Sequence, residues 1–579
     1  MKKLLKYFSP YIWPLILMAI SIFCQVSATL ALPDYMAKII NEGIVGQNTK
    51  VIFHNGLIMI LITIGGGLAT VAVGYLASKV GTGFARDLRN AVFTKIESFS
   101  LVEFNKFSTA SLITRTTNDV QQVQMVSIMV FRIALMAPLM GIIATIKAYQ
   151  LAPSMTWIMA VAVVALISIV TVLFRIVTPK FDILQKLVDK LNLVTREILT
   201  GLRVIKAFNK EKYEEEKFNN VNQELTRLNL FVNRLMMILQ PAMMLIMNFM
   251  MIAIVWFGAH QISLGNLQIG NMLAFLQYSM QAVSAFLMIS IIFIAIPRAS
   301  VSAGRIAEVL ETDVSIKDPK NPVKAPRRGG KVEFKNVTFA YPGATEPVLH
   351  NISFVALPGQ TTAFVGSTGS GKSTIINLIP RFYDVTEGQI LVDDVDIRDM
   401  KLQDLRARIG YVSQKAILFS GTIKENIGYG NPNATQEEIF RAAATAQALE
   451  FIKELDQKFD GSIAQAGSNF SGGQKQRLAI ARALAKNPEL YLFDDSFSAL
   501  DFKTDAALRN ALKRETQGKT VLIVTQRVGT IMDADKIIVI ETGKIVGEGT
   551  HKELLKTCEV YREIAASQLS PEELTRDLS

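Results

Sequence analysis

A glycine-rich segment at residues 366–373 has the residue types and spacing of a phosphate-binding loop. It reads Gly-Ser-Thr-Gly-Ser-Gly-Lys-Ser, follows an apolar run at Thr361–Val365 and precedes a helical pattern at Thr374–Pro380. Such glycines let backbone N–H groups close around phosphates, and the start of the helix adds partial positive charge. We predict a nucleotide site in which Lys372 reaches the β- and γ-phosphates and Ser373 binds Mg²⁺. The predicted loop comprises Gly366, Ser367, Thr368, Gly369, Ser370, Gly371, Lys372, Ser373 and Thr374.

Two acidic residues follow a second apolar run, Leu490-Tyr-Leu-Phe-Asp494-Asp495. A strand that ends in an acid commonly carries a magnesium-associated aspartate in proteins with a phosphate-binding loop. The two motifs also occur in the usual order along the chain. We therefore expect Asp494 to lie beside Mg²⁺, with Asp495 next to it.

A third segment, Ser471-Gly472-Gly473-Gln474, begins a helical pattern that continues to Ala485. Small residues at the start of a helix expose backbone N–H groups to an anion. This segment is therefore a second candidate phosphate contact.

The elements that hold these motifs fall into two halves. Half of the 579 residues are hydrophobic, and long apolar runs stop near Pro297. A chain of this length needs more than one domain. We expect an all-α transmembrane domain at 1–317, a linker rich in Pro, Lys, Arg and Gly at 318–330, and an α/β nucleotide-binding domain at 331–579, where strand and helix patterns alternate as in a parallel sheet.

Six runs are long enough to cross a membrane, which requires about 20 apolar residues. The predicted spans are Tyr11–Leu32, Gly56–Ala77, Val126–Ala148, Ser154–Arg175, Met236–Gly258 and Met272–Ile296. The first follows a basic N-terminus, is too long for a signal peptide, and is expected to be retained. The gaps after spans two and four, Ser78–Met125 and Ile176–Leu235, are long, basic and helical in pattern. Their tips are expected at Phe107–Arg115 and Leu199–Phe208, in contact with a nucleotide-binding domain.

The distribution of charge predicts orientation and excludes one class of partner. The chain has a net charge of +11, and its basic residues gather in the two long gaps. Basic loops stay on the cytoplasmic side, so we expect a multi-pass protein of the plasma membrane with a cytoplasmic N-terminus and nucleotide-binding domain. No nucleic-acid motif is present. The two cysteines, Cys24 and Cys558, lie in different halves and form no disulfide framework.

Taken together, Ser471–Gln474, the phosphate-binding loop and six spans in one chain resemble an ATP-binding cassette (ABC) exporter half-transporter. The resemblance covers almost the whole chain and implies ATP and Mg²⁺ as cofactors. It also implies that two such subunits sandwich two ATP molecules, each between the loop of one chain and the Ser471–Gln474 signature of the other. The helical tips would be the coupling helices that rest on the cassettes.

The same resemblance implies roles for further residues. Tyr341 matches the aromatic residue that stacks on adenine, and Gln414 matches the glutamine that touches magnesium and senses the γ-phosphate. Asp501, in Ser498-Ala-Leu-Asp501, matches the D-loop that crosses to the partner cassette.

Two residues depart from the family pattern at positions that act on the attacking water during ATP hydrolysis. Asp495 stands where the family usually has the glutamate that acts as general base, so the carboxylate retreats by roughly 1–1.5 Å, and a misplacement of about 1 Å can lower a rate about a hundredfold. Gln526 replaces the switch histidine and cannot carry a charge. A smaller departure is Gln465 in place of glutamate.

These departures resemble one half of a heterodimeric multidrug ABC exporter. We expect the chain to bind ATP at its own slow site, with Asp495 and Gln526 as its catalytic residues, and to supply its signature to a partner's competent site. Low charge in the spans, and seven methionines in span five, favour export of hydrophobic or amphipathic compounds. A lipid or lipopeptide flippase, a homodimeric exporter and a regulatory subunit are the alternatives.

Overall fold

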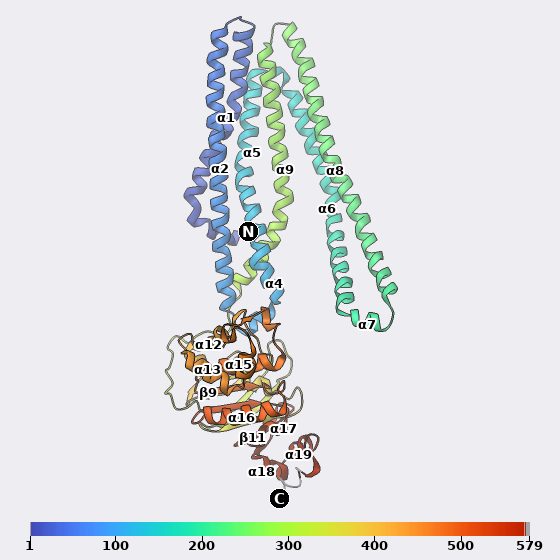
Figure 1. The fold of residues 1–579 in the computed structure, drawn as a ribbon. Coiled ribbons are helices and arrows are strands. Elements are labelled where there is room, and N and C mark those ends of the chain that lie inside the picture. Colours follow the sequence, from blue (N-terminus) through green and yellow to red (C-terminus); the bar gives the residue numbers. More distant parts are fainter. Residues whose placement is uncertain (1, 573, 575–579) are drawn as a thin grey trace. The chain divides into compact units, whose positions relative to one another are not determined.

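The computed structural model describes residues 2–572 and 574, which form two compact units (Figure 1). The first unit comprises Met1–Glu97 and Thr109–Thr312, and the second comprises Ser98–Ser108 and Asp313–Ser579. A short segment from the helical half therefore belongs with the C-terminal half.

Long helices make up the first unit, and within the described residues six of them are long and apolar enough to cross a membrane. They are α1 (Ile12–Lys38), α2 (Thr49–Glu97), α5 (Val120–Leu151), α6 (Thr156–Thr200), α8 (Glu211–Ser263) and α9 (Ile269–Glu311). Each predicted span corresponds to one of these helices, which confirms the fold class of this half. At 1.5 Å per residue, α2 is about 70 Å long, more than twice the hydrocarbon thickness of a bilayer.

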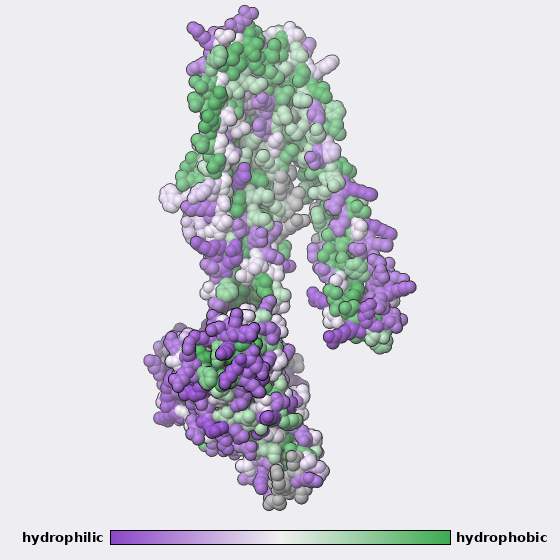
Figure 2. Space-filling view, viewed as in Figure 1, coloured by the Kyte–Doolittle hydropathy of each residue, from purple (hydrophilic) through white to green (hydrophobic). Residues whose placement is uncertain are grey.

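Short elements join the long helices. They are η1 (Lys2–Tyr11), η2 (Ile39–Ile44), α4 (Thr109–Thr114), η3 (Arg115–Asp119), η4 (Pro153–Met155) and α7 (Leu202–Ala207). The predicted tip at Leu199–Phe208 coincides with α7, which turns the chain from α6 into α8. Figure 2 shows hydrophilic residues gathered on this hairpin near α7.

Apolar side chains cover much of the outer surface of the long helices, as lipid contact requires. Phe53 is 79% exposed and Trp256 is 75% exposed. Alanine, methionine and branched aliphatic residues fill most of the interior, where α5 packs along α9 and α1 along α2. A partly exposed ion pair lies among these helices: Lys147 Nζ lies 2.5 Å from Asp34 Oδ2, and the buried Tyr278 donates to Asp34 Oδ1 at 2.6 Å. This cluster joins α1, α5 and α9.

The second unit contains two principal sheets. The larger has the order β12-β11-β3-β10-β9-β6, parallel except for β12. Its strands are β3 (Thr361–Val365), β6 (Ile409–Val412), β9 (Leu490–Asp494), β10 (Thr520–Val524), β11 (Lys536–Glu541) and β12 (Lys544–Gly549). The expected parallel sheet is therefore present.

A second sheet, β2-β1-β4-β5, is antiparallel and was not predicted. It contains β1 (Val332–Phe339), β2 (Leu349–Ala356), β4 (Glu387–Val392) and β5 (Val395–Asp396), and a small ladder pairs β7 (Gly421–Thr422) with β8 (Ser462–Ile463). The helices are α10 (Lys372–Leu378), α11 (Leu402–Ala407), α12 (Ile423–Gly428), α13 (Gln436–Thr445), α14 (Leu449–Glu454), α15 (Gly472–Ala485), α16 (Phe502–Glu515), α17 (Val528–Ile531), α18 (His551–Thr557) and α19 (Glu559–Ala566), with the short turns η5 (Lys458–Asp460) and η6 (Gln465–Gly467).

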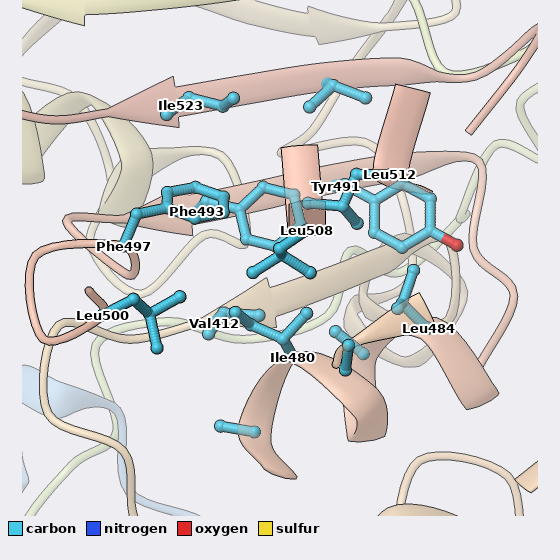
Figure 3. Close-up of a cluster of buried hydrophobic side chains, with 14 of the residues drawn as sticks. Val412, Ile480, Leu484, Tyr491, Phe493, Phe497, Leu500, Leu508, Leu512 and Ile523 are labelled. Carbon is cyan, nitrogen blue, oxygen red and sulfur yellow. The ribbon is translucent and has the colours of Figure 1, made fainter. Parts of the chain in front are cut away.

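Strand β9 lies between β10 and β6 in the larger sheet, and every residue in it is buried. Figure 3 shows its Tyr491 and Phe493 among Ile480 of α15 and Leu508 of α16. Burial on both faces explains the apolar run, since a parallel strand covered on both sides lacks a polar face. The core thereby fixes the strand that ends in Asp494 against the helix that begins after Ser471.

Helix α3 (Leu101–Lys106) lies in the segment Ser98–Ser108 and contacts the rest of the second unit. Glu103 is buried; it accepts hydrogen bonds from Ser100 N at 2.9 Å and from Ser315 N at 3.0 Å. Asn105 donates to the Tyr383 hydroxyl at 3.2 Å, and Val102 packs on the core beneath the antiparallel sheet. The predicted tip at Phe107–Arg115 overlaps the segment Ser98–Ser108 at Phe107 and Ser108, and the contacts given above come from α3, just before it.

Replacement of Glu103 by alanine is expected to loosen α3. The change leaves the N–H groups of Ser100 and Ser315 without their acceptor, which costs about 1–3 kcal/mol for a fully buried donor and less for these partly exposed ones. Hydrogen exchange of residues 101–106, measured by mass spectrometry in lipid nanodiscs, should be at least tenfold faster in Glu103→Ala. Glu97→Ala, at an exposed position, is the control. Equal exchange in both variants would show that Glu103 does not hold this helix.

Candidate functional site

The loop between β3 and α10 adopts the tight turn that its glycines predict. A Cβ on Gly366 would lie 2.0 Å from the carbonyl oxygen of Ile540, so the strand β11 leaves no room for a side chain there. Gly371 caps α10 with a φ of 99°, a left-handed conformation that favours glycine. The loop therefore turns its backbone N–H groups toward one place, at the N-terminus of α10.

Lys372 is buried within this loop. Its ammonium donates to the carbonyl oxygens of Gly366 at 2.9 Å and Ser367 at 2.6 Å. Burial lowers the pKa of Lys372, and the negative charges of Asp495 and Asp494 oppose that shift. A cation held here by carbonyl oxygens, near two carboxylates, can bind the anionic oxygens of a phosphate.

Asp494, the last residue of β9, accepts a hydrogen bond from Ser373 Oγ at 2.7 Å. Burial raises the pKa of Asp494, the Ser373 hydrogen bond opposes that shift, and the charge of Asp495 adds to it. Strand pairing explains the contact, because parallel strands β3 and β9 both end at this edge of the sheet. The structure thus brings together two residues that are 121 positions apart in the sequence.

Asp495 adopts a left-handed backbone conformation, with a φ of 46°. Its side chain is 9% exposed, and its Oδ2 accepts from Gln414 Nε2 at 3.4 Å. Its Oδ1 is buried and, within the described residues, has no hydrogen-bond partner. A buried carboxylate oxygen without a partner is costly, so its presence points to a ligand contact.

A cavity of about 240 Å³ joins these groups into one site. Its lining includes Thr368, Gly369, Gly371, Lys372, Ser373, Thr374, Gln414, Asp495 and Gln526. Thus Asp495 and Gln526, which the sequence places 31 positions apart, face the same space as the phosphate-binding loop. The oxygens of Ser373, Gln414 and Asp494 are hard ligands of the kind Mg²⁺ prefers, and the partnerless Asp495 Oδ1 beside them fits a nearby cation.

Tyr341 lies at the other side of the loop, just beyond β1. Its hydroxyl lies 3.0 Å from Thr374 Oγ1, and its ring is edge-on to Phe339 and to Tyr383. These contacts leave Tyr341 partly exposed and fixed in orientation. It is therefore suitably placed to stack on a flat ring.

The Ser471–Gln474 segment does not line this cavity. Ser471 caps α15: its hydroxyl accepts from Gln474 N at 3.3 Å, and Gln474 Oε1 accepts from Ser471 N at 2.9 Å. Ser471 and Gly472 are exposed. Within this chain the segment is thus a preformed helix start that is not part of the chain's own phosphate site.

Asp501 also acts as a helix cap, because its carboxylate accepts from Thr504 N at 2.9 Å at the start of α16. A contact that the sequence did not reveal lies nearby. Arg527 donates to the carbonyl oxygens of Ser498 at 2.7 Å and Leu500 at 3.3 Å. It joins the segment that contains Gln526 to the segment that precedes Asp501. Its position directly after Gln526 was the only available signal.

A phosphate-binding ATPase unit and a six-helix membrane unit in one chain define a membrane transporter driven by nucleotide hydrolysis. Family models agree: the ABC transporter transmembrane region matches residues 15–286, and the ABC transporter cassette matches residues 349–498. An uncharacterized ABC transporter ATP-binding protein of Mycobacterium tuberculosis is 41% identical over 95% of this chain and 96% of its own. The chain belongs to the ABC transporter family.

Two further relatives extend this comparison. YfiB of Bacillus subtilis, also an uncharacterized ABC transporter ATP-binding protein, is 37% identical over 99% of both chains. An ATP-dependent lipid A-core flippase of Pseudomonas aeruginosa is 32% identical over 88% of this chain and 84% of its own.

The fold also matches a solved structure of a bacterial Atm1-family ABC exporter with ATP bound. The TM-score is 0.81 at 26% identity, and the match covers 97% of this chain and 98% of the other. The protein is thus a multi-pass membrane protein and an ATP-driven ABC exporter, whose fold works as a dimer and whose cassette binds ATP and couples hydrolysis to transport.

Replacement of Lys372 by alanine is expected to weaken ATP binding. The ammonium supplies a charged hydrogen bond of about 1.5–3 kcal/mol, so the Kd for ATP should rise roughly tenfold to a hundredfold. Lys544→Ala, at an exposed position of β12, is the matched control. Equilibrium binding of a fluorescent ATP analogue measures the change. An unaltered Kd in Lys372→Ala would contradict the assignment of this loop as the phosphate site.

Proposed function

We propose that this chain is the slow-site subunit of a heterodimeric exporter. It holds ATP between Tyr341 and the loop Gly366–Thr374, with Ser373, Gln414 and Asp494 around Mg²⁺. When bound, Mg²⁺ would neutralise negative charge on the β- and γ-phosphates. The chain hydrolyses this ATP slowly and lends its signature, Ser471–Gln474, to the partner's site.

The position of the Asp495 carboxylate carries this proposal. The carboxylate lies in the cavity beside Lys372 and Ser373, where a general base is required. One methylene shorter than glutamate, it ends roughly 1–1.5 Å further from the attacking water, and a base must come within about 2.6–3.2 Å of the proton it takes. The Gln414 contact at 3.4 Å further holds Oδ2 at the wall of the cavity.

Gln526 weakens the same step in a different way. It follows β10 and lines the cavity, so its amide can donate a hydrogen bond to a phosphate oxygen. A neutral amide adds less stabilisation than a charged donor when negative charge builds up on the transferred group. Both residues nearest the water therefore favour retention of ATP over its hydrolysis.

Two surfaces support a partner subunit. The signature segment is exposed at the start of α15, outside the chain's own cavity. At the tip of the α6–α8 hairpin, Val204 is 61% exposed and Phe208 is 71% exposed. Apolar side chains on an otherwise hydrophilic tip indicate a docking contact. We propose that α7 rests on the partner's cassette, with D-loop residue Asp501 at the same interface and both cassettes in the cytoplasm.

Two apolar cavities in the helical unit support a hydrophobic or amphipathic substrate. One, of about 400 Å³, lies between α6 and α9, and the other, of about 500 Å³, lies between α5 and α9. Four methionines line the second cavity: Met125, Met129, Met136 and Met288. Flexible methionine side chains can adapt to ligands of several shapes, which is suitable for multidrug efflux.

A lipid or lipopeptide flippase is the second candidate. Each cavity has one arginine in its wall, Arg175 in the first and Arg132 in the second. In the part of the chain that the structure describes, neither guanidinium has an ion pair, and an arginine in a membrane helix commonly contacts a ligand or a lipid head group. The flippase relatives support this alternative, since lipids with anionic head groups would complement both residues.

Restoring the longer carboxylate is expected to accelerate hydrolysis. When each chain is purified alone, Asp495→Glu should have an ATPase activity roughly tenfold or more above that of the wild type. The longer side chain brings the carboxylate closer to the attacking water. Asp456→Glu, the same change at an exposed site, serves as control. High activity of the unaltered chain alone would sink the proposal of a slow site.

Arg132 separates the two transport candidates. In proteoliposomes of zwitterionic lipid, cationic lipophilic compounds should stimulate ATP hydrolysis in the wild type and at least as strongly in Arg132→Gln, because loss of the arginine removes a repulsion. If anionic phospholipids stimulate hydrolysis instead, and Arg132→Gln reduces that effect severalfold, the flippase reading replaces the multidrug reading. Lys79→Gln, at an exposed position of α2, is the control.

A further inference from the structure

Gln568 lies two residues beyond α19, on the exposed surface of the C-terminal segment. Its side-chain amide nevertheless makes two hydrogen bonds to the segment that contains Gln526. Oε1 accepts from Val528 N at 2.8 Å, and Nε2 donates to the Gln526 carbonyl oxygen at 2.8 Å. Both distances are in the favourable range for N–H···O hydrogen bonds.

The two bonds fix the orientation of the amide. Rotation of the amide by 180° would set its NH₂ group against the Val528 N–H and its oxygen against the Gln526 carbonyl, so only one arrangement pairs donors with acceptors. The amide therefore holds the peptide groups on both sides of Arg527. No other residue type of similar length offers a donor and an acceptor in this geometry.

The backbone of Gln568 is itself anchored. Its N–H donates to the Ala565 carbonyl at 3.0 Å, and the next residue, Leu569, donates to the same carbonyl at 2.9 Å and packs against the core. Tyr561 and Ala565 of α19 are fully buried. The side-chain amide of Gln568 therefore extends from a backbone that is held in place by hydrogen bonds and by the buried residues of α19.

Arg527 holds the same segment from another direction, through the carbonyls of Ser498 and Leu500. Residues 526–528 are therefore fixed between the segment before Asp501 and the C-terminal segment. Gln526 lines the ATP cavity, and its carbonyl accepts from Gln568. A displacement of that carbonyl would move the side chain beside the phosphates.

We propose that Gln568 is a positioning residue for hydrolysis, which sets the place of Gln526 in the ATP cavity from the C-terminal segment. The inference rests on the proposed role of Gln526 at the γ-phosphate. It requires neither a slow site nor a heterodimer. Through this contact, a partner or modification that displaces residues 567–569 would change the rate of hydrolysis without touching the nucleotide.

The test compares Gln568→Ala and Gln568→Glu with Gln517→Ala, an exposed glutamine at a site remote from the cavity. The glutamate variant keeps an acceptor for Val528 N and lacks the donor for the Gln526 carbonyl. Full-length transporter in nanodiscs is assayed with MgATP, in the wild-type background and with Asp495→Glu. We expect kcat to fall three- to tenfold in both Gln568 variants, with KM within twofold.

Hydrogen exchange supplies a second readout. Exchange at the Val528 amide should become roughly tenfold faster in Gln568→Ala and stay near wild type in Gln568→Glu. Unchanged kcat and exchange in Gln568→Ala would overturn the inference. So would a loss of kcat that follows a lower melting temperature, because that indicates a structural role alone.

Gln526→Ala distinguishes the two proposals. If it leaves kcat unaltered, the assignment of Gln526 at the γ-phosphate fails. If it lowers kcat while Gln568→Ala does not, only the present inference fails.

Discussion

Ser373 Oγ donates to Asp494 at 2.7 Å, in a site where Lys372 and two adjacent carboxylates are all buried. Two acids and one base leave this interior with an excess of negative charge, which burial makes costly unless cations balance it. Mg²⁺ would supply the missing positive charge beside the carboxylates, and Lys372 with the loop N–H groups would hold the phosphates of the nucleotide. The phosphate-binding residues of the cassette are therefore placed where bound cations can balance these charges.

The surrounding fold keeps these charges in place. Strand β9 is buried on both faces by α15 and α16, so the end that carries Asp494 has little freedom. Since the same core fixes the start of α15, the signature segment and the phosphate site are positioned by one set of apolar contacts. Helix α3 packs within the same unit through Glu103 and Val102.

Features set by local patterns could be predicted from the sequence. The loop at 366–373, the strand before Asp494 and all six long helices depend on neighbouring residues, and each is present. Contacts between distant positions were not predictable: Lys147 with Asp34, Glu103 with Ser315, and Gln568 with Val528 each join residues whose spacing follows no motif. The antiparallel sheet was missed for a similar reason, because alternation predicts a strand and says little about its partners. Helix α3, just before the predicted tip of the first long gap, was not predicted because it has only six residues and is held by contacts far along the chain.

The central proposal is that this chain retains ATP at its own site while the partner's site turns over. The most direct measurement is photolabelling of the transporter, purified from native membranes, with azido-ATP that carries radiolabel on either the α- or the γ-phosphate. After many turnovers, the account predicts that this chain carries both labels equally and that the partner loses the γ-label. Loss of the γ-label from this chain at the partner's rate would contradict it.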